Sequence, residues 1–202
     1  MVNDWDVTCR DFLSPLKSGD KLEFKVGDAN AGSFSVSELP NSDAVLLLVI
    51  HRHDTVSTAV SFESHVFASL PNSQIAVIDT YKGSKKSLPR ILDSKKALNQ
   101  VASRSEELRY DSVVAVNPGV YEVDLSDASG NMKQKRELVA LNHESYVVLR
   151  MGVESQQGES FPEELVIYPQ SDMNALPHSG ASAGAVWLTP LLALVGALVG
   201  SA

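Results

Sequence analysis

Residues 119–141 read GVYEVDLSDASGNMKQKRELVAL, and this stretch contains two runs of strand-forming residues on either side of a turn. The runs GVYEVDL (119–125) and RELVAL (136–141) are rich in valine, leucine and other residues that favour strands. Between them lies DASGN (127–131), where Gly130 and Asn131 tolerate a positive φ. The stretch therefore predicts two strands joined by a turn.

Runs of the same kind occur on both sides of this stretch, with turn residues between them. The run AVLLLVI (44–50) is continuously apolar, which predicts a strand that is covered on both faces. About ten strands at a spacing of about 8–12 residues favour an antiparallel β-sandwich over residues 21–169, after an N-terminal arm at 1–20. Besides those already given, the expected strands are 21–26, 33–38, 57–67, 74–81, 112–116, 145–151 and 164–168.

Residues 82–109 differ in composition from the rest of the chain. Apolar residues recur at helical spacing from Ala97 to Leu108, which predicts a helix over roughly 94–109, inserted between strands. The segment holds eight of the seventeen Lys and Arg residues and three acids, in a chain whose net charge is −8. Its charges either form a solvated face or dock an acidic protein or an anionic glycan. The second interpretation makes these residues a partner-binding site: Lys82, Lys85, Lys86 and Arg90.

The segment NPGVYEVDLSDASGNMKQKRELVALNHESYVVLRMG (117–152) carries a family resemblance. It has the order Pro-Gly-x-Tyr-x-Val, turn, Leu-rich strand and Tyr-x-Val-x-x-x-Gly strand. In this it resembles the closing strands of Ig-like and prealbumin-like secreted β-sandwich modules, although the segment 82–109 departs from their pattern. The resemblance implies an Ig-like β-sandwich. One family of such secreted domains, of uncharacterised function, is similar in this respect, and its members are generally regarded as non-catalytic.

The stretch AGAVWLTPLLALVGALVGSA (183–202) contains no charged residue. As a helix it would be about 30 Å long, which matches the hydrocarbon core of a bilayer. We therefore expect a stalk at 170–184 and a hydrophobic helical tail at 185–202 that anchors the chain in a membrane. The alternative, a C-terminal helix packed on the domain, would normally have a polar face, and this stretch has none.

Two forms of attachment fit this tail, a retained transmembrane helix or a glycolipid-anchor (GPI) signal. The small triplet Ser179-Gly180-Ala181 suggests cleavage at Ser179, but the polar spacer that follows is shorter than such signals require. No Lys or Arg occurs after Arg150, which favours an exoplasmic or lumenal location for the domain. Residues 1–15 carry three acids and do not form a signal peptide, so either the tail enters from the cytosol or the true start of the chain is missing.

The sequence HRHD (51–54) carries the best candidate for metal chemistry. Alternation along a strand places His51 and His53 on one face, where two imidazoles could share a metal ion. A site of this kind needs a further ligand, for which Glu63, His65 and His143 are candidates. Alternatively, both histidines are polar groups at a strand end that bond to backbone carbonyls.

Other chemistries find little support in the sequence, and no cofactor is predicted. The negative net charge excludes a general nucleic-acid binder. Cys9 has no paired histidine and is expected to be inert, and no glycine-rich phosphate loop follows a strand. The G-x-S-x-G match around Ser182 lacks a downstream acid and histidine, which excludes a hydrolase of that type.

The sequence thus favours a membrane-anchored β-sandwich that is not an enzyme and that serves adhesion, scaffolding or ligand binding at an exoplasmic or lumenal surface. Two alternatives stay open. One is a metal-binding protein or metal-dependent enzyme centred on His51 and His53, and the other is an accessory subunit of a membrane protein complex.

Overall fold

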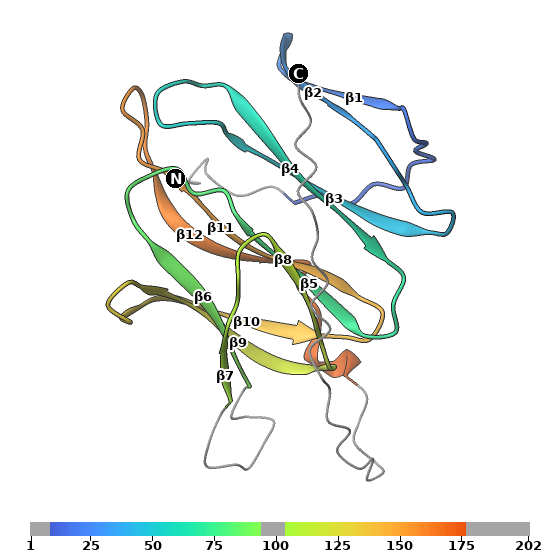
Figure 1. The fold of residues 1–202 in the computed structure, drawn as a ribbon, viewed down its shortest axis with the longest axis vertical. Coiled ribbons are helices and arrows are strands. Elements are labelled where there is room, and N and C mark those ends of the chain that lie inside the picture. Colours follow the sequence, from blue (N-terminus) through green and yellow to red (C-terminus); the bar gives the residue numbers. More distant parts are fainter. Residues whose placement is uncertain (1–8, 94–103, 177–202) are drawn as a thin grey trace. The chain divides into compact units, whose positions relative to one another are not determined.

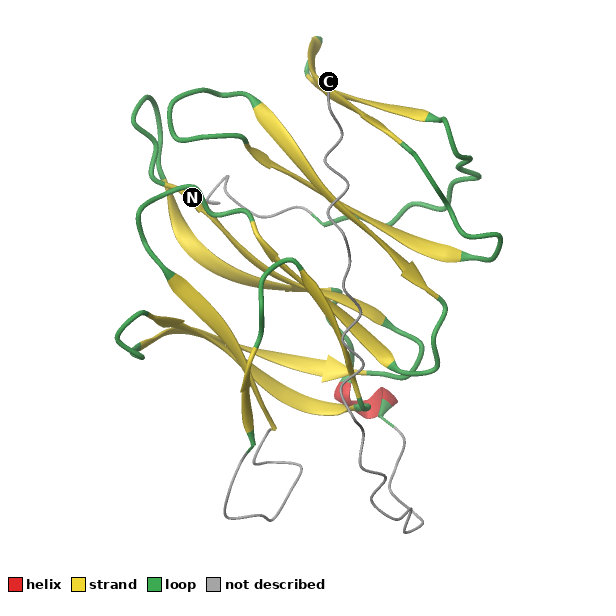
Figure 2. Cartoon of the chain, viewed as in Figure 1, coloured by secondary structure: helices red, strands yellow, loops and turns green. Residues whose placement is uncertain are grey.

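The computed structural model describes residues 9–93 and 104–176 of the chain. Within these ranges the protein is mainly β, with one short 3-10 helix at Met173–Ala175 (Figure 2). The described ranges contain twelve strands: β1 (Lys21–Val26), β2 (Ala29–Ser35), β3 (Ala44–Arg52), β4 (Val60–Ala68), β5 (Ser73–Asp79), β6 (Ser87–Asp93), β7 (Ser105–Glu107), β8 (Ser112–Val116), β9 (Gly119–Asp127), β10 (Met132–Ala140), β11 (Ser145–Val153) and β12 (Phe161–Tyr168).

The chain divides into two compact units, Met1–Asn41 and Ser42–Ala202. The described part of the first unit is built on the antiparallel hairpin β1–β2, which the turn at Gly27 joins. The strand predicted at 33–38 begins earlier, at Ala29, because it pairs with β1 from Val26 onward. The sequence interpretation assigned residues 21–35 to the sandwich domain, whereas the structure groups them with the first unit.

The second unit contains two four-stranded sheets and a separate hairpin, β3–β4 (Figure 1). The strand orders of the two sheets are β12-β11-β5-β8 and β10-β9-β6-β7. All neighbouring strands are antiparallel except β5 and β11, which run parallel in a sheet that the sequence analysis expected to be purely antiparallel.

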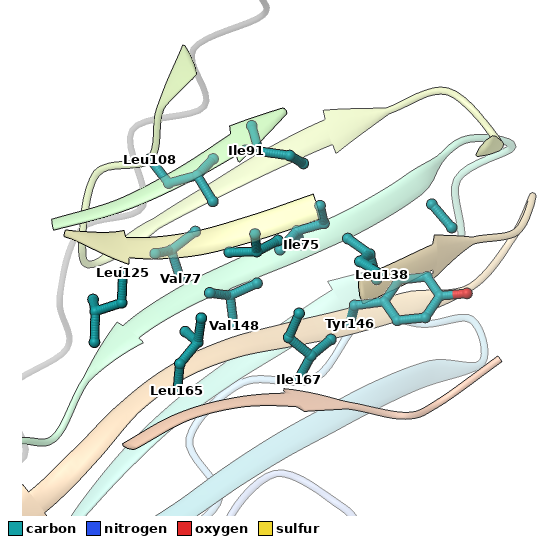
Figure 3. Packing of buried hydrophobic residues seen from close by; sticks show 12 residues of the cluster. Ile75, Val77, Ile91, Leu108, Leu125, Leu138, Tyr146, Val148, Leu165 and Ile167 are labelled. Atoms are coloured by element: carbon teal, nitrogen blue, oxygen red, sulfur yellow. The ribbon is translucent and has the colours of Figure 1, made fainter. Parts of the chain in front are cut away.

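The two four-stranded sheets share one hydrophobic core, which is shown in Figure 3. The first sheet contributes alternate residues such as Ile75 on β5 and Val148 on β11, and the second contributes Leu125 on β9 and Leu138 on β10. Each of these four side chains is at most 1% exposed. This shared core is consistent with a β-sandwich.

A second cluster covers the other face of the sheet that contains β5 and β11. Here Ala76, Ile78, Val147 and Leu149 pack with Phe67 of β4. Two strands are therefore buried on both faces, and they are β5 and β11.

The prediction that 44–50 is covered on both faces is wrong. One face of β3 carries Leu47 and Val49, which pack against the second cluster. On the opposite face Ile50 is 44% exposed. A continuous apolar run cannot distinguish a central strand from a strand of a covering hairpin, because both are apolar on the face that packs.

The prediction of a helical insert is also wrong where it can be compared with the structure. Residues 105–107 form β7, which pairs with Arg90–Leu92 of β6, and β6 lies between β7 and β9 in its sheet. Leu108, which supported the helical spacing, is 3% exposed and packs in the sandwich core. Strand pairing overrides the local preference here. Residues 94–103 and the C-terminal helix expected at 185–202 lie outside the described residues.

Candidate functional site

The histidines that the sequence analysis singles out, His51 and His53, lie at the end of the hairpin β3–β4 where the loop joins the two strands. The side chain of His51, at the end of β3, is 7% exposed. Its Nδ1 lies 2.8 Å from the carbonyl oxygen of Arg52, and its Nε2 lies 3.7 Å from Oε1 of Glu63. Since a carbonyl oxygen only accepts, Nδ1 carries the proton in the neutral ring, and Nε2 presents a lone pair.

The surroundings of His51 favour the neutral form of its ring. Burial lowers the pKa of His51, and the positive charge of Lys82 lowers it further, against the opposing effects of the Arg52 carbonyl and of Glu63. In the described part of the chain Nε2 has no hydrogen-bond partner. A buried, unpaired lone pair close to a carboxylate is an unfavourable arrangement unless a cation or a proton lies between them.

His53 lies on the same face of the hairpin as His51. Its Nδ1 is 2.7 Å from Oγ of Ser61, and Ser61 is the residue directly opposite His51 on β4. Opposite residues of an antiparallel pair point to the same face, so Ser61 shares a face with His51, and His53 reaches that face through its contact with Ser61. His53 itself is exposed.

Of the three further ligands considered, Glu63 is the one that lies beside His51. His65 packs edge-on against Phe67, with ring centroids 4.6 Å apart. His143 lies elsewhere, with Nδ1 3.2 Å from the carbonyl oxygen of Leu70. Within residues 9–93 and 104–176, no group of three or more His, Cys, Asp or Glu is close enough to hold a metal ion. The metal site stays a prediction.

The predicted basic site covers the connection from β5 to β6 and part of β6 itself. Lys85 is 3.6 Å from Glu154, so part of the local positive charge has a partner. Arg90 lies in β6, opposite Asp124 of β9 and Glu107 of β7. Lys86 is exposed and Lys82 is partly exposed. Acidic residues are therefore interspersed with these cations, and an acidic partner stays a prediction.

A further polar cluster among the described residues is one that the sequence analysis did not single out. It is centred on Arg150 of β11, whose side chain is 5% exposed. Arg150 donates from Nε to Glu163 at 2.7 Å, from Nη1 to Asp79 at 2.9 Å and from Nη2 to the carbonyl oxygen of Lys85 at 2.6 Å. Its guanidinium carbon lies 4.3 Å from the centroid of the Tyr81 ring.

The interactions of the Arg150 cluster hold parts of the fold together. Burial alone would lower the pKa of Arg150, but the hydrogen bond to Glu163 and the charge of Asp79 outweigh burial and raise it. The bonds to Asp79 and Lys85 fix the segment where the chain leaves β5 for the other sheet. The charged guanidinium group is thus held by two carboxylates and one backbone carbonyl, and these charge-assisted bonds fix its position.

A close approach beside the cluster is made at Gly83. A Cβ there would lie 2.6 Å from the Tyr81 hydroxyl and 2.8 Å from the carboxyl group of Glu154. Glu154 accepts hydrogen bonds from the backbone N–H of Ser84 at 2.8 Å and from its hydroxyl at 2.9 Å. The Ser84 backbone bond first, and then the Tyr81 hydroxyl, lower the pKa of Glu154 to about 2.

The remaining predicted sites give limited structural information. Cys9 is exposed, and desolvation followed by the charge of Asp11 raises the pKa of its thiol, which reduces the thiolate fraction. Ser179, Ser182 and the tail 185–202 lie outside the described residues. Among the residues that the structure describes, no helix is both long and apolar enough to cross a membrane.

No family model, curated protein sequence or solved structure matches this chain. Its function therefore has to be inferred from its own residues and their arrangement.

Proposed function

We propose that this protein is a non-catalytic binding module with an Ig-like β-sandwich, attached to a membrane by residues 185–202 and displayed on an exoplasmic or lumenal surface. Adhesion, scaffolding and ligand binding are the roles that such a module serves. The observation that carries the proposal is the uncharged stretch 183–202, which is long enough as a helix to span a bilayer.

The arrangement of strands supports the Ig-like part of the proposal. After β5 the chain passes to the other sheet for β6 and β7, returns for β8, crosses again for β9 and β10, and ends in the first sheet with β11 and β12. Repeated crossing between two facing sheets is typical of Ig-like sandwiches and leaves loops at both ends for recognition.

The polar groups of the second unit support a role in binding rather than catalysis. Arg150 and its carboxylates are committed to one another, and Tyr81 lies against the guanidinium group. Three of the four cations at 82–90 are exposed, and they are Lys85, Lys86 and Arg90. Their charges favour an acidic protein or an anionic glycan as the partner.

Membrane fractionation tests the attachment. The full chain, a chain without residues 183–202 and the variant Leu192→Arg/Val195→Arg are expressed side by side. Two arginines at the centre of a span cost about 2.5–3.5 kcal/mol each, so both altered chains are expected in the aqueous fraction while the full chain sediments with membranes. Release of the full chain by phospholipase indicates a glycolipid, and retention until detergent is added indicates a spanning helix.

Two results would contradict the proposal. One is a full-length chain that remains a monomer in aqueous solution. The other is membrane association that the Leu192→Arg/Val195→Arg variant leaves unchanged. A defined hetero-complex in detergent extracts would instead favour the accessory-subunit alternative.

A further inference from the structure

We propose that the outer edge of β8 (Ser112–Val116) is an interface at which a second copy of this chain adds its own β8 in antiparallel pairing. In the described ranges the only strand that pairs with β8 is β5, so β8 forms one end of its sheet. Every second residue of such an edge strand turns its N–H and C=O groups away from the neighbouring strand. This inference is independent of the membrane attachment proposed above, because its residues all lie in the described part of the second unit.

Side chains occupy the opposite end of the same sheet, at β12. Gln134 of β10 donates from Nε2 to the carbonyl oxygen of Glu163 at 2.5 Å and accepts at Oε1 from the backbone N–H of Leu165 at 2.9 Å. Gln170 donates from Nε2 to the carbonyl oxygen of Ile167 at 2.7 Å. These bonds satisfy backbone groups of β12, so a strand that added to this edge would have to displace both glutamine side chains.

Charged residues protect the two edge strands of the other sheet, β7 and β10. The short strand β7 contains Glu106 and Glu107. The strand β10 contains Lys133, Lys135 and Arg136. Antiparallel pairing of either strand with its own copy about the middle residue would place Glu106 opposite Glu106, or Arg136 opposite Arg136. Like charges directly opposite each other are destabilising, so neither strand suits a second copy of itself.

The strand β8 differs from these three edges because its sequence, SVVAV, contains no charged residue. Within the strand Ala115 is exposed. Side chains hold the strand in place from both faces. Val114 and Val116 pack against the core that the two sheets share, and Val113 packs against the second cluster. An incoming strand therefore meets a preformed edge, and little conformational entropy is lost in ordering it.

The sequence of β8 is complementary to that of its own copy. A two-fold axis through Val114, the middle residue of the strand, pairs every residue of β8 with a residue of the second copy. These pairs contain no charge, and they are Val114 with Val114, Val113 with Ala115, and Ser112 with Val116. Just outside the strand, Asp111 lies opposite Asn117 of the second copy, whose amide can donate to the carboxylate. A second copy thus meets this edge without repulsion, and the pairing joins two sheets into one continuous sheet.

Disulfide trapping of the full chain in detergent tests both the contact and its register. Cys9→Ser removes the exposed thiol and is the background for two variants. Val114→Cys should give a disulfide-linked dimer under mild oxidation, because the Cα atoms of directly opposite residues lie about 4.5–5.5 Å apart, within the range of a disulfide. Val116→Cys, on the same face of the same strand, is the matched control. Position 116 lies opposite Ser112 of the second copy, so the two introduced thiols would be separated by about 14 Å along the strands and should stay unlinked.

Sedimentation equilibrium of the full chain in the same detergent measures the association itself. Ala115→Lys should weaken it by about tenfold, because the two symmetry-related pairs with Val113 are lost. Ser105→Lys is the control, since it adds the same charge to an exposed position on the edge strand β7, and it should associate as the unaltered chain does. Both substituted side chains are exposed, so both variants are expected to fold.

Either of two results would overturn the proposal. One is cross-linking that is equal, or equally absent, in Val114→Cys and Val116→Cys. The other is a chain that stays monomeric at every concentration. Slow hydrogen exchange of the β8 amides that point away from β5 in such a monomer would identify another segment of the same chain, or a bound peptide, as the occupant of this edge instead.

Discussion

Replacing Arg150 with methionine should cost far more stability than an arginine substitution at the surface. The change removes the positive charge but keeps an apolar side chain of similar length against Tyr81. It leaves Glu163 and Asp79, whose side chains are only 10% and 26% exposed, without their cation. Breaking a buried ion pair by removing one partner costs about 3–5 kcal/mol, which is a large share of the about 5–15 kcal/mol that stabilises an ordinary domain.

The measurement is urea unfolding of the full chain in detergent, followed by far-ultraviolet circular dichroism with linear extrapolation to water. Arg136→Met is the matched control. Arg136 forms a surface pair with Glu164 at 3.4 Å and is 44% exposed, so its loss should cost about 0–1 kcal/mol.

A triple variant distinguishes the cost of unpaired carboxylates from the cost of lost packing. Suppose that Arg150→Met is destabilising because it leaves two carboxylates unpaired. The triple variant Arg150→Met/Asp79→Asn/Glu163→Gln should then recover more than half of the lost free energy of unfolding, because burying a neutral amide costs less than burying a carboxylate. A single variant that loses less than about 1 kcal/mol, or a triple variant that is less stable than the single one, would refute this account of the Arg150 cluster.

Three further outcomes are expected. Gly152→Ala should destabilise the protein more than Gly83→Ala, because a Cβ at position 152 would collide with the backbone carbonyl of Pro162, and φ there is +124°. A Cβ at position 83 would meet only side chains, which can move. Gly119→Ala, whose Cβ would make ordinary contacts at 3.6 Å, is the control, and thermal unfolding measures the order of the three losses. Because the pKa of Glu154 in the folded state is depressed to about 2 from an ordinary value of 4.5, its contribution to stability is present above about pH 4.5 and is lost as the pH falls toward 2. Glu154→Gln should remove this part of the pH dependence of the free energy of unfolding, measured by urea titrations from pH 7 to 2. An unchanged loss of stability at acidic pH in this variant would contradict the assignment. Leu125→Ala, at a core side chain with 0% exposure, should cost about 2–5 kcal/mol, while Leu70→Ala, at 44% exposure, should stay within about 0.5 kcal/mol in the same assay; similar losses would mean that the shared core is misplaced.

The sequence by itself determined most of the strands. Lys21–Val26 and Ser112–Val116 have the bounds that the pattern predicts, and the turn at 127–131 forms around Asp127, which accepts hydrogen bonds from the backbone N–H groups of Ser129 and Asn131 at 2.9 Å. Strand alternation and turn chemistry are local properties, because they depend on backbone geometry over a few residues. The same local alternation placed His51 and His53 on one face.

Sequence reasoning failed where the decision depended on residues far apart in the chain. The strand Ser87–Asp93 contains a proline and several polar residues, and it becomes a strand because it pairs with β7 and β9. For the same reason, the pattern could not show that β5 and β11, rather than β3, are buried on both faces.

The candidate sites divide in the same way. From the sequence, Arg150 was one cation at the end of an apolar run, and only the fold brings it to Asp79, 71 residues earlier, and to Glu163. Likewise, the spacing indicated the histidine pair, but only the register of β3 against β4 shows that Glu63, rather than His65 or His143, lies beside His51. Local periodicity thus determined which residues form strands and which way they face. Only the tertiary structure decided which strands pair and which charges meet, because those energies arise between segments that chain order does not bring together.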